Sequence, residues 1–428
     1  MNRPIIEPDH EANGSPSVLF IDQSGQLGGA ELSLLALAER YPGPCRVVLL
    51  ADGPLRAKLE TVGIQTMVCA MPSALARVDR GAGLTGALRR TPGSVGVIRR
   101  LARLAKSCDV VHANTQKAWV LGAVAARLAR KPAVWHLRDI LTADHFSRVN
   151  RTVAVRLANR LATRVIANSQ ATADAFVEAG GRPALTQVIW NGVAPPQASS
   201  PETTPADQVW RRAGADVPQD APVVAVFGRL SPWKGQHVAI DAVANLPGVH
   251  LVLVGAPLFG EDDYAGQLRQ QIDDAGLQDR VHMPGFCENV AELMRAADVV
   301  LHCSTAPEPF GRVLVEAMLC RRPVVAADAG GPREIMRDRY TGRLTRPSDA
   351  EHLAQTLREL LSSPDERRRL ADAGYDDAMA RFTLAPMVDA VTRTLTQAAA
   401  RSTTEPRRAP VPPAMSAARS ADSELAAR

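Results

Sequence analysis

The sequence contains few cysteines and no long apolar segment. Its six cysteines, among 428 residues, stand at scattered positions without the spacing of a metal site or a redox pair. This scatter argues against a disulfide framework and predicts reduced thiols in a cytoplasm. No apolar run reaches the roughly 18 residues that a membrane span needs, and residues 1–16 are too polar for a signal peptide. We therefore expect a cytoplasmic protein that can reach a membrane only from its surface.

Signs of a metal site and of a nucleic-acid site are also missing. No Asp-x-Asp motif stands out, because Asp262-Asp263 and Asp273-Asp274 are adjacent pairs on an expected helix, where exposure to solvent is the simpler interpretation. Aromatic residues do not alternate with basic ones as they do in nucleic-acid-binding surfaces. The sequence therefore predicts no bound metal and no nucleic-acid partner.

The charge of the chain is unevenly distributed. Of its 50 basic and 45 acidic residues, 24 basic and 14 acidic ones lie in residues 1–200. The first part of the chain therefore carries a net charge of +10, and the rest carries −5. We expect the first part to attract an anionic partner.

Short apolar runs alternate with longer amphipathic segments along both halves of the chain. Strands are expected, for example, at Val18–Asp22, Val110–Ala113 and Ala133–Leu137, and again at Val223–Phe227 and Val299–His302. Repeated β-α alternation predicts parallel sheets with helices on both faces. Ligands of such sheets bind beyond the carboxyl ends of the strands. The predicted fold class is α/β, with two Rossmann-like parallel-sheet domains that face each other across a cleft.

The same pattern divides the chain into successive parts, as expected for a length that suits two domains. The chain after Asp365 is expected to be helical to about Ala400, after which Pro, Ser and Ala predominate. The predicted parts are a disordered N-terminus (1–16), an N-terminal domain (17–195), a linker (196–210), a C-terminal domain (211–385), a C-terminal helix that packs back toward the N-terminal domain (386–400) and a disordered tail (401–428).

The most informative segment is P-E-P-F-G-R-V-L-V-E-A-M, which holds the carboxylates of Glu308 and Glu316 eight residues apart. Pro309 and Gly311 place Glu308 on a loop and start a helix near Gly311. Glu316 then lies about a turn and a half inside that helix. One acid faces the start of the helix, whose free N–H groups and dipole suit a phosphate, and the other lies along its wall. This layout fits a phosphorylated sugar held at both ends.

Two loops that follow the first strand of each half offer contacts to a phosphate. Gly28 and Gly29 let the backbone approach a ligand at the start of a helix, although their spacing is not that of a dinucleotide motif and a tight turn alone is the alternative. In the second loop, Arg229 and Lys234 can converge on a diphosphate if the loop curls, which Pro232 favours. Two solvated charges are the alternative there.

A histidine stands near the end of another expected strand, in the segment W-H-L-R-D. His136 is expected at the carboxyl edge of the sheet, facing the cleft. A purely structural histidine is the alternative, and Asp139 could equally cap the next segment.

Taken together, these segments resemble the GT4 family of retaining glycosyltransferases, also called the glycosyl transferases group 1 family, which has the GT-B fold. The segments fall in the family's order and cover most of residues 17–385. The Glu-x7-Glu segment is highly specific, L-G-G-A-E is moderately so, and the others corroborate. The matching segments are L-G-G-A-E (27–31), W-H-L-R-D (135–139), G-R-L-S-P-W-K-G (228–235), E-P-F-G-R-V-L-V-E-A-M (308–318) and G-G-P-R-E (330–334).

The resemblance implies a role for each matched residue, with the acceptor in the first domain and the donor in the second. Arg229 and Lys234 would bind the donor diphosphate and stabilise the charge that grows on the leaving group. Glu308 would hold hydroxyls of the transferred sugar, and Glu316 would hold the hydroxyls of the nucleotide ribose. The other implied contacts are the backbone N–H groups of Phe310, Gly311 and Arg312 with the diphosphate, His136 near the reacting sugar, Gly28 and Gly29 opposite the phosphates, and Phe286 and Cys287 beside the nucleotide base.

The implied reaction moves a hexosyl unit from a UDP- or GDP-sugar to a hydroxyl of a glycan or a lipid-linked acceptor, in the synthesis of an envelope, an exopolysaccharide or a glycolipid. No cofactor is required, because side-chain cations and a helix dipole absorb the charge of the leaving group in place of a metal. In front-face attack the leaving phosphate takes the acceptor proton, and a double displacement through a carboxylate stays open.

Three alternatives to a transferase remain at this point: a sugar-nucleotide epimerase, a phosphorylase of similar fold, and a catalytically silent sugar-nucleotide-binding protein. The complete set of Arg229, Lys234, Glu308 and Glu316 argues against the silent protein.

Two basic segments of the first half indicate how a membrane-bound acceptor would be reached. A basic amphipathic helix can lie on an anionic membrane, and a solvated charged face is the alternative. With lipid-linked acceptors common in the family, we expect a peripheral protein at the inner face of the plasma membrane. One segment carries Arg89, Arg90, Arg99, Arg100, Arg103 and Lys106, and the other carries Arg148, Arg151, Arg156, Arg160 and Arg164 close to one helical face.

Overall fold

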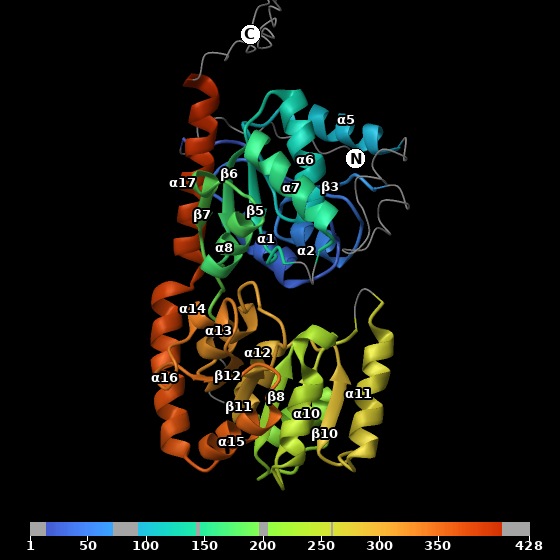
Figure 1. Cartoon of the computed structure of the whole chain (residues 1–428), viewed down its shortest axis with the longest axis vertical. Coiled ribbons are helices and arrows are strands. Elements are labelled where there is room, and N and C mark those ends of the chain that lie inside the picture. The colour runs from blue at the N-terminus through green and yellow to red at the C-terminus, as the bar shows by residue number, and fades with distance from the viewer. Residues whose placement is uncertain (1–13, 72–92, 143–145, 197–203, 258–259, 405–428) are drawn as a thin grey trace, which may run out of the picture.

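The computed structural model contains two α/β domains, stacked one above the other in Figure 1. The expected disorder at the two ends of the chain falls mainly outside the described residues, as do Arg89 and Arg90 of the first basic segment. The structure describes residues 14–71, 93–142, 146–196, 204–257 and 260–404.

The N-terminal domain is built on a sheet of seven parallel strands in the order β3-β2-β1-β4-β5-β6-β7. The strands are β1 (Val18–Asp22), β2 (Cys45–Leu49), β3 (Gln65–Val68), β4 (Val110–Ala113), β5 (Ala133–Leu137), β6 (Ala162–Ala167) and β7 (Thr186–Val188). Three of the strands expected above, β1, β4 and β5, have the predicted bounds.

Helices cover both faces of this sheet. Leu19 and Ile21 of β1 pack with α5, α6, α7 and α8, whereas Val18 and Phe20 pack with α1, α2 and α17. Alternate residues of one strand thus enter two cores, which is why the strand is apolar from Val18 to Ile21. The helices are α1 (Gly29–Arg40), α2 (Pro54–Thr61), α5 (Gly93–Ala105), α6 (Gln116–Ala129), α7 (Arg148–Leu161), α8 (Gln170–Glu178) and α17 (Leu384–Thr404), with a short 3₁₀ turn at Pro183–Leu185.

The C-terminal domain repeats the plan with six parallel strands in the order β10-β9-β8-β11-β12-β13. One face packs with α9, α12 and α13, the other with α10, α11 and α15, and α16 reaches both cores. The strands are β8 (Val223–Phe227), β9 (His250–Val254), β10 (Val281–Gly285), β11 (Val299–His302), β12 (Val324–Ala327) and β13 (Arg343–Thr345). The helices are α9 (Ala206–Ala213), α10 (Gln236–Ala244), α11 (Asp262–Asp274), α12 (Val290–Ala296), α13 (Arg312–Leu319), α14 (Pro332–Ile335), α15 (Ala350–Leu361) and α16 (Pro364–Arg381).

The predicted linker is too long at its C-terminal end. Residues 204–210 are described, and from Ala206 they form α9. The helix forms because Val209 and Trp210 are buried in the second core, where Trp210 is fully covered. This burial assigns α9 to the C-terminal domain.

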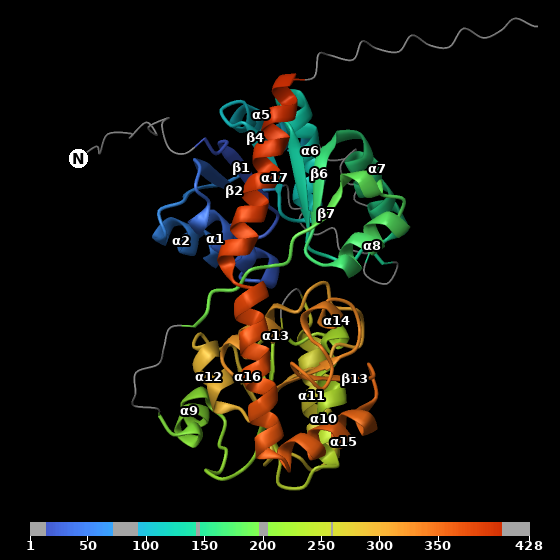
Figure 2. The same cartoon turned by 90° about the vertical axis from the view of Figure 1, so that its left-hand side faces the viewer.

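The helical stretch expected from Asp365 to about Ala400 consists of two helices. α16 ends at Arg381 and α17 begins at Leu384, and the two follow one side of both domains nearly end to end (Figure 2). The break falls where the chain returns from the second domain to the first. There it meets Val193, on the segment that leads from the first domain to the second. Val193 pairs with Thr383 and donates its N–H to the carbonyl of Phe382 at 2.8 Å. Phe382 is fully buried there, which anchors the break.

Candidate functional site between the two domains

The carboxylate of Glu308 lies at the centre of the residues that the sequence singled out. It stands on the loop between β11 and α13, and its side chain is 12% exposed. Lys234 Nζ lies 2.5 Å from Glu308 Oε2, and His302 Nε2 lies 3.1 Å from the same oxygen. Burial alone would raise the pKa of Glu308, but Lys234 and His302 outweigh it and hold that pKa well below its ordinary range. Glu308 is therefore a buried, ionised carboxylate with its own counter-ion.

The two predicted cations lie around the ring of Trp233. A 3₁₀ turn at Pro232–Lys234 follows β8 and brings Lys234 Nζ to 4.2 Å from the ring centre. Arg229 Cζ lies 5.7 Å from the same ring, so both charges are within reach of its electron-rich π-system. The loop therefore curls, which was the condition for Arg229 and Lys234 to converge on a diphosphate. The alternative of a solvated charge does not describe Lys234, which is 20% exposed and ion-paired.

The second acid of the Glu-x7-Glu segment lies on the wall of α13. The helix begins at Arg312, directly after Gly311, so the spacing predicted its start to within one residue. Glu316 Oε1 accepts a hydrogen bond of 2.7 Å from Arg312 Nε. Phe310 is buried and meets Phe382 edge-on, with ring centres 5.9 Å apart. The loop between β11 and α13 is thus packed on its apolar side, through Phe310, and carries the polar Glu308.

At the start of α1, the two glycines predicted to leave room for a phosphate differ, because a Cβ on Gly29 would meet nothing within 4 Å whereas the space beside Gly28 is occupied. A Cβ on Gly28 would lie 2.5 Å from Glu31 Oε2, so the absent side chain makes room for an acid of the protein itself. Burial, followed by the nearby Asp22 carboxylate, raises the pKa of Glu31 to about 8. The placement of Gly28 and Gly29 opposite the phosphates rests on the resemblance alone.

His136 does not face an open cleft, contrary to the prediction. Its side chain has no exposed surface, and its Nδ1 lies 3.2 Å from Nε2 of His112 on the neighbouring strand β4. Burial, followed by the positive charge of Arg138, lowers the pKa of His136 well below its ordinary value, so the ring is neutral. β5 is a central strand with helices on both faces, and this cover buries even its penultimate residue.

A buried ionic cluster in the N-terminal domain was missed by the sequence reasoning. Asn114 Nδ2 donates to Asp22 Oδ2 at 2.6 Å, and Arg138 Nε donates to Asn114 Oδ1 at 3.0 Å. Arg138 also donates from Nη1 to Asn191 Oδ1. Burial raises the pKa of Asp22 to about 6 and lowers that of Arg138 to about 9. The cluster holds Arg138 and Asp22 as a bridged pair inside the domain.

A signal for this cluster was available. Asp22 ends β1, Asn114 directly follows β4, and Arg138 directly follows β5. These three strands are neighbours in the sheet, so their carboxyl ends meet at one edge. The signal in the sequence is a polar residue at the end of each of these apolar runs. One of these residues, Arg138, belongs to the segment W-H-L-R-D.

Phe286 and Cys287 follow β10 at the corresponding edge of the second sheet. Phe286 is 67% exposed, and Cys287 is half-buried. β9 lies between β10 and β8, which places the pair about 10 Å along the sheet from the strand that leads to Arg229. The exposed ring of Phe286 offers a flat apolar face to a ligand.

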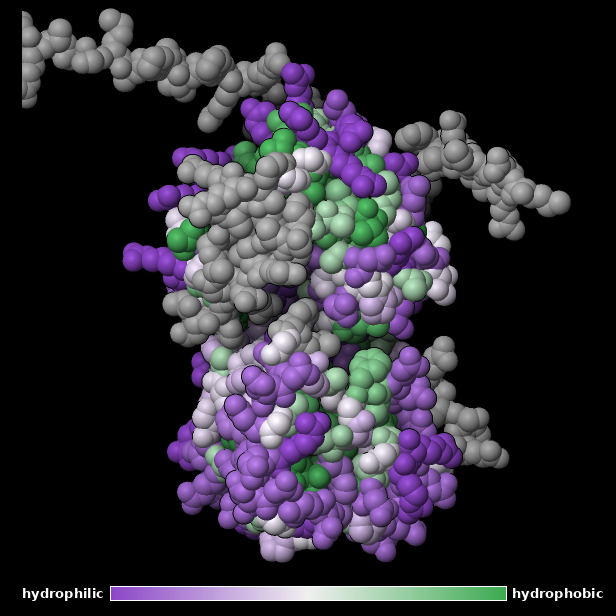
Figure 3. All heavy atoms as spheres, turned by 90° about the vertical axis from the view of Figure 1, so that its right-hand side faces the viewer, coloured by the Kyte–Doolittle hydropathy of each residue, from purple (hydrophilic) through white to green (hydrophobic). Residues whose placement is uncertain are grey.

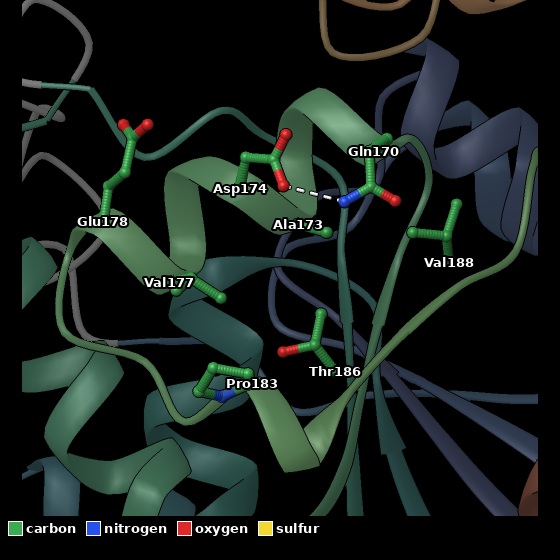
Figure 4. A pocket seen from close by; sticks show the side chains of 8 residues that line it. All are labelled: Gln170, Ala173, Asp174, Val177, Glu178, Pro183, Thr186 and Val188. Atoms are coloured by element: carbon green, nitrogen blue, oxygen red, sulfur yellow. Dashed lines mark hydrogen bonds between the residues drawn. The ribbon is translucent and has the colours of Figure 1, made fainter.

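A pocket of about 680 Å³ opens at one edge of the N-terminal sheet, between α8 and the edge strand β7 (Figure 4). Its two charged residues, Asp174 and Glu178, are acidic, and Gln170 Nε2 donates to Asp174 Oδ1 at 2.7 Å. None of the residues that the sequence singled out lies in this pocket. The lining residues are Gln170, Ala173, Asp174, Val177, Glu178, Pro183, Thr186 and Val188.

Two properties concern the described residues as a whole. They include no group of three or more His, Cys, Asp or Glu side chains placed to hold a metal ion. No helix in this part of the chain has both the length and the apolar character needed to cross a membrane.

Sequence comparison finds related proteins over both domains. Residues 27–196 match the family described as Glycosyltransferase Family 4, and residues 211–377 match the family described as Glycosyl transferases group 1. A D-inositol 3-phosphate glycosyltransferase of Stackebrandtia nassauensis is 30% identical over 71% of this chain and 71% of its own length. The lipopolysaccharide core biosynthesis glycosyltransferase LpsE of Rhizobium meliloti is 34% identical over 42% of this chain, a match that spans about half (51%) of LpsE.

Solved structures extend the likeness over nearly the whole described chain. HepE from Anabaena, in complex with UDP-glucose, is 41% identical, with a TM-score of 0.80 over 89% of this chain and 100% of the HepE chain. A second HepE structure, in complex with UDP and glucose, is 42% identical, with a TM-score of 0.80 over 89% of this chain and 99% of that one.

Proposed function

The chain belongs to the GT4 family of glycosyltransferases, with two Rossmann-like domains in the GT-B arrangement, and from this membership we propose that it is a retaining hexosyltransferase with a UDP-sugar donor. The observation that carries the proposal is the Lys234–Glu308 ion pair beside Arg229. Two cations and an ionised carboxylate stand on neighbouring loops at the carboxyl ends of β8 and β11, which is where ligands of parallel sheets bind.

The proposed mechanism assigns the charge of the leaving group to these cations. When the bond between the sugar C1 and the diphosphate oxygen breaks, negative charge grows on the diphosphate and positive charge at C1. Lys234 and Arg229 stabilise the former, together with the N–H groups at the start of α13, around Phe310, Gly311 and Arg312. Lys234 then exchanges part of its contact with Glu308 for a phosphate oxygen. The freed carboxylate oxygen of Glu308 accepts a hydroxyl of the transferred sugar.

The remaining contacts of the proposal follow from position. Glu316 binds the ribose hydroxyls from the wall of α13, and the exposed ring of Phe286, with Cys287, borders the base. His136 acts near the reacting sugar only through a movement that uncovers it, because its side chain is buried. The UDP-glucose bound by HepE supports a uridine nucleotide as the donor.

The donor and the mechanism are tested with a panel of UDP- and GDP-sugars. We expect UDP-sugars to raise the melting temperature more than GDP-sugars do, UDP release to continue in EDTA, and the new glycosidic bond to keep the anomeric configuration of the donor in NMR spectra. Loss of activity in EDTA, or an inverted product, would contradict the proposal. Conversion of the donor alone into a second UDP-sugar would favour an epimerase, and binding without turnover across acceptors would favour a silent protein.

We also propose that the acceptor is an envelope glycan or glycolipid presented at an anionic membrane surface. Figure 3 shows apolar residues gathered on one face of the N-terminal domain beside strongly hydrophilic ones, whereas the C-terminal domain is mainly hydrophilic there. On α7, Arg148, Arg156 and Arg160 are exposed, and on α5 the exposed basic residues stand beside Val95, which is 51% exposed. Arg164 does not belong to this face, because it lies on β6.

The membrane proposal predicts salt-dependent binding to vesicles. Each basic residue near an anionic surface contributes about 1 kcal/mol, so we expect the double variant Arg156→Glu and Arg160→Glu to reduce co-sedimentation with phosphatidylserine vesicles at least about tenfold at low salt. The matched control is Arg211→Glu with Arg212→Glu on α9, two exposed arginines of the C-terminal domain. Equal pelleting of the wild type with neutral and anionic vesicles would refute the proposal.

A further inference from the structure

One carboxylate of the C-terminal domain accepts hydrogen bonds from the first residues of a helix in the N-terminal domain. Glu334, on the short helix α14, accepts hydrogen bonds from the backbone N–H of Gln170 at 2.8 Å and of Ala171 at 2.9 Å. Its Oε2 also accepts from Trp190 Nε1 at 3.0 Å. Three donors of one domain thus converge on a single side chain of the other, 144 to 164 residues away in the chain.

The geometry at α8 shows that the helix is completed by this contact. The first N–H groups of a helix have no partner within it, and a negative charge is favoured there. Ser169, the residue before α8, accepts the N–H of Thr172 with its hydroxyl at 3.0 Å. The N–H groups of the two residues between them, Gln170 and Ala171, are taken by Glu334. The cap of α8 is therefore shared between the two domains.

Glu334 is rigidly joined to the loop that carries Glu308. Glu308 pairs with Gly330, and its carbonyl accepts the N–H of Gly331 at 2.8 Å. A Cβ on Gly330 would lie 2.4 Å from that carbonyl oxygen, so the two loop backbones touch. A second contact follows the same line, since Thr172 Oγ1 of α8 donates to the carbonyl of Pro309 at 3.4 Å. A displacement of Glu334 therefore also moves the loop between β11 and α13 that carries Glu308, which we call the donor loop.

The two chain segments that pass between the domains also contact Glu334 and the donor loop. Arg381 at the end of α16 donates from Nη2 to the carbonyl of Glu334 at 2.7 Å, and its guanidinium lies 4.8 Å from the ring centre of Trp190. Trp190 meets Phe382 edge-on at 5.4 Å, and Phe382 in turn meets Phe310 of the donor loop at 5.9 Å. Ring contacts and hydrogen bonds thus form a continuous connection from the donor loop, through the segments that pass between the domains, to α8.

We infer that Glu334 is a positioning residue for the transfer reaction: its carboxylate on the first N–H groups of α8 holds the N-terminal domain in register with the donor loop. This inference rests on the proposed function, in which the acceptor side and the donor side must meet. Glu334 itself touches neither the sugar nor the diphosphate in that scheme. Removing its charge should therefore affect turnover much more than donor binding.

The test is Glu334→Gln, which keeps the size of the side chain, loses the charge and places an amide NH₂ group where it competes with backbone donors. The matched control is Asp328→Asn, which also removes a carboxylate charge, on the loop that leads into α14, where Asp328 pairs with Arg333 of its own domain at 2.8 Å. Trp190→Phe is a graded second variant, because it keeps a ring beside Arg381 and removes one of the three donors.

Two readouts separate positioning from a general loss of structure. Hydrogen exchange at the amides of Gln170 and Ala171 should become at least about tenfold faster in Glu334→Gln without ligand, while exchange in β1 and β8 stays at the wild-type level. With a UDP-sugar donor, kcat should fall about 10- to 100-fold while the Kd for UDP stays within about threefold. Trp190→Phe should show smaller changes in the same direction, and Asp328→Asn should match the wild type.

The outcomes distinguish this inference from the proposed function. Wild-type exchange at the two amides, or wild-type kcat in Glu334→Gln, would overturn the positioning role. An equal fall in kcat and in UDP affinity would make Glu334 a donor ligand and also overturn it. If Glu334→Gln does not fold, unchanged exchange at the same amides in Trp190→Phe overturns the inference. Absence of transfer by the wild type would count against the proposed function, whereas the exchange experiment needs no donor.

Discussion

Turnover should fall about 10²- to 10³-fold when Lys234 is replaced by alanine, the size of loss seen when one group that stabilises transition-state charge is removed. Lys234 supplies a fixed positive charge beside Arg229, and its ammonium lies 2.5 Å from Glu308. In the variant, the carboxylate of Glu308 stays buried with His302 and the hydroxyl of Ser304 as its remaining partners. Its pKa should then rise, because burial is no longer outweighed by the ammonium. Steady-state kinetics with a UDP-sugar measures the loss.

Three companion variants decide what the loss means. Glu308→Ala should lower turnover by a similar factor, because it removes the sugar contact and leaves Lys234 unpaired. Lys234→Arg keeps the charge but not the compact ammonium, so partial activity is expected. Arg269→Ala, an exposed cation on α11 of the same domain, should behave as the wild type. Wild-type turnover in both Lys234→Ala and Glu308→Ala would remove the basis of the proposed mechanism.

The second large effect is expected on stability, from Arg138→Met. Arg138 is 5% exposed and lies in the buried cluster that contains Asp22, with Glu31 close enough for its charge to act on the guanidinium. Removing one partner of a buried ion pair typically costs about 3–5 kcal/mol, because the other charge is left uncompensated. We expect a loss of this size in the free energy of unfolding at pH 8, measured by chemical denaturation.

The loss should depend on pH, and its direction follows from the two carboxyl groups. The pKa of Asp22 is raised to about 6 and that of Glu31 to about 8. At pH 5 both groups hold a proton in the folded state, so Arg138 has no ionised partner among them and its removal should cost less than half as much. At pH 8 Asp22 is ionised and Glu31 is about half ionised, so the full cost appears.

The control for this prediction is Arg127→Met, an exposed arginine on α6 that makes the same chemical change outside the cluster. It should change the free energy of unfolding by no more than about 0.5 kcal/mol at either pH. An equal loss for Arg138→Met at pH 5 and pH 8 would show that the cluster is held by packing rather than by charge.

The strands were predictable because parallel strands with helices on both faces are apolar throughout. Val18–Asp22 and Val223–Phe227 have the predicted bounds for this reason, since every residue of each is buried. The geometry of Glu308 and Glu316 was predictable as well, because Pro309 and Gly311 restrict where a helix can start. In both cases the information is local.

What could not be predicted depends on parts of the chain that meet only in the folded protein. The burial of His136 depends on helices packed over β5. The sequence shows that Asp22 and Asn114 lie at strand ends, but their pairing depends on β1 and β4 being neighbours in the sheet. Glu334 was noted only as the last residue of G-G-P-R-E. Its partner Gln170 is 164 residues away, and nothing local indicates which helix it reaches.

The position of α17 has a consequence for the order in which the chain is made. Its buried side chains Leu384, Val391 and Leu395 belong to the same apolar cluster as Val18 and Phe20, the first residues of the first sheet. A ribosome must add roughly 200 residues after β7 before this helix exists, which takes about 10–40 s at synthesis rates of about 5–20 residues per second. During that time this face of the nascent first sheet is covered by α1 and α2 but lacks α17, so completion of the first domain waits until the second domain has been synthesised.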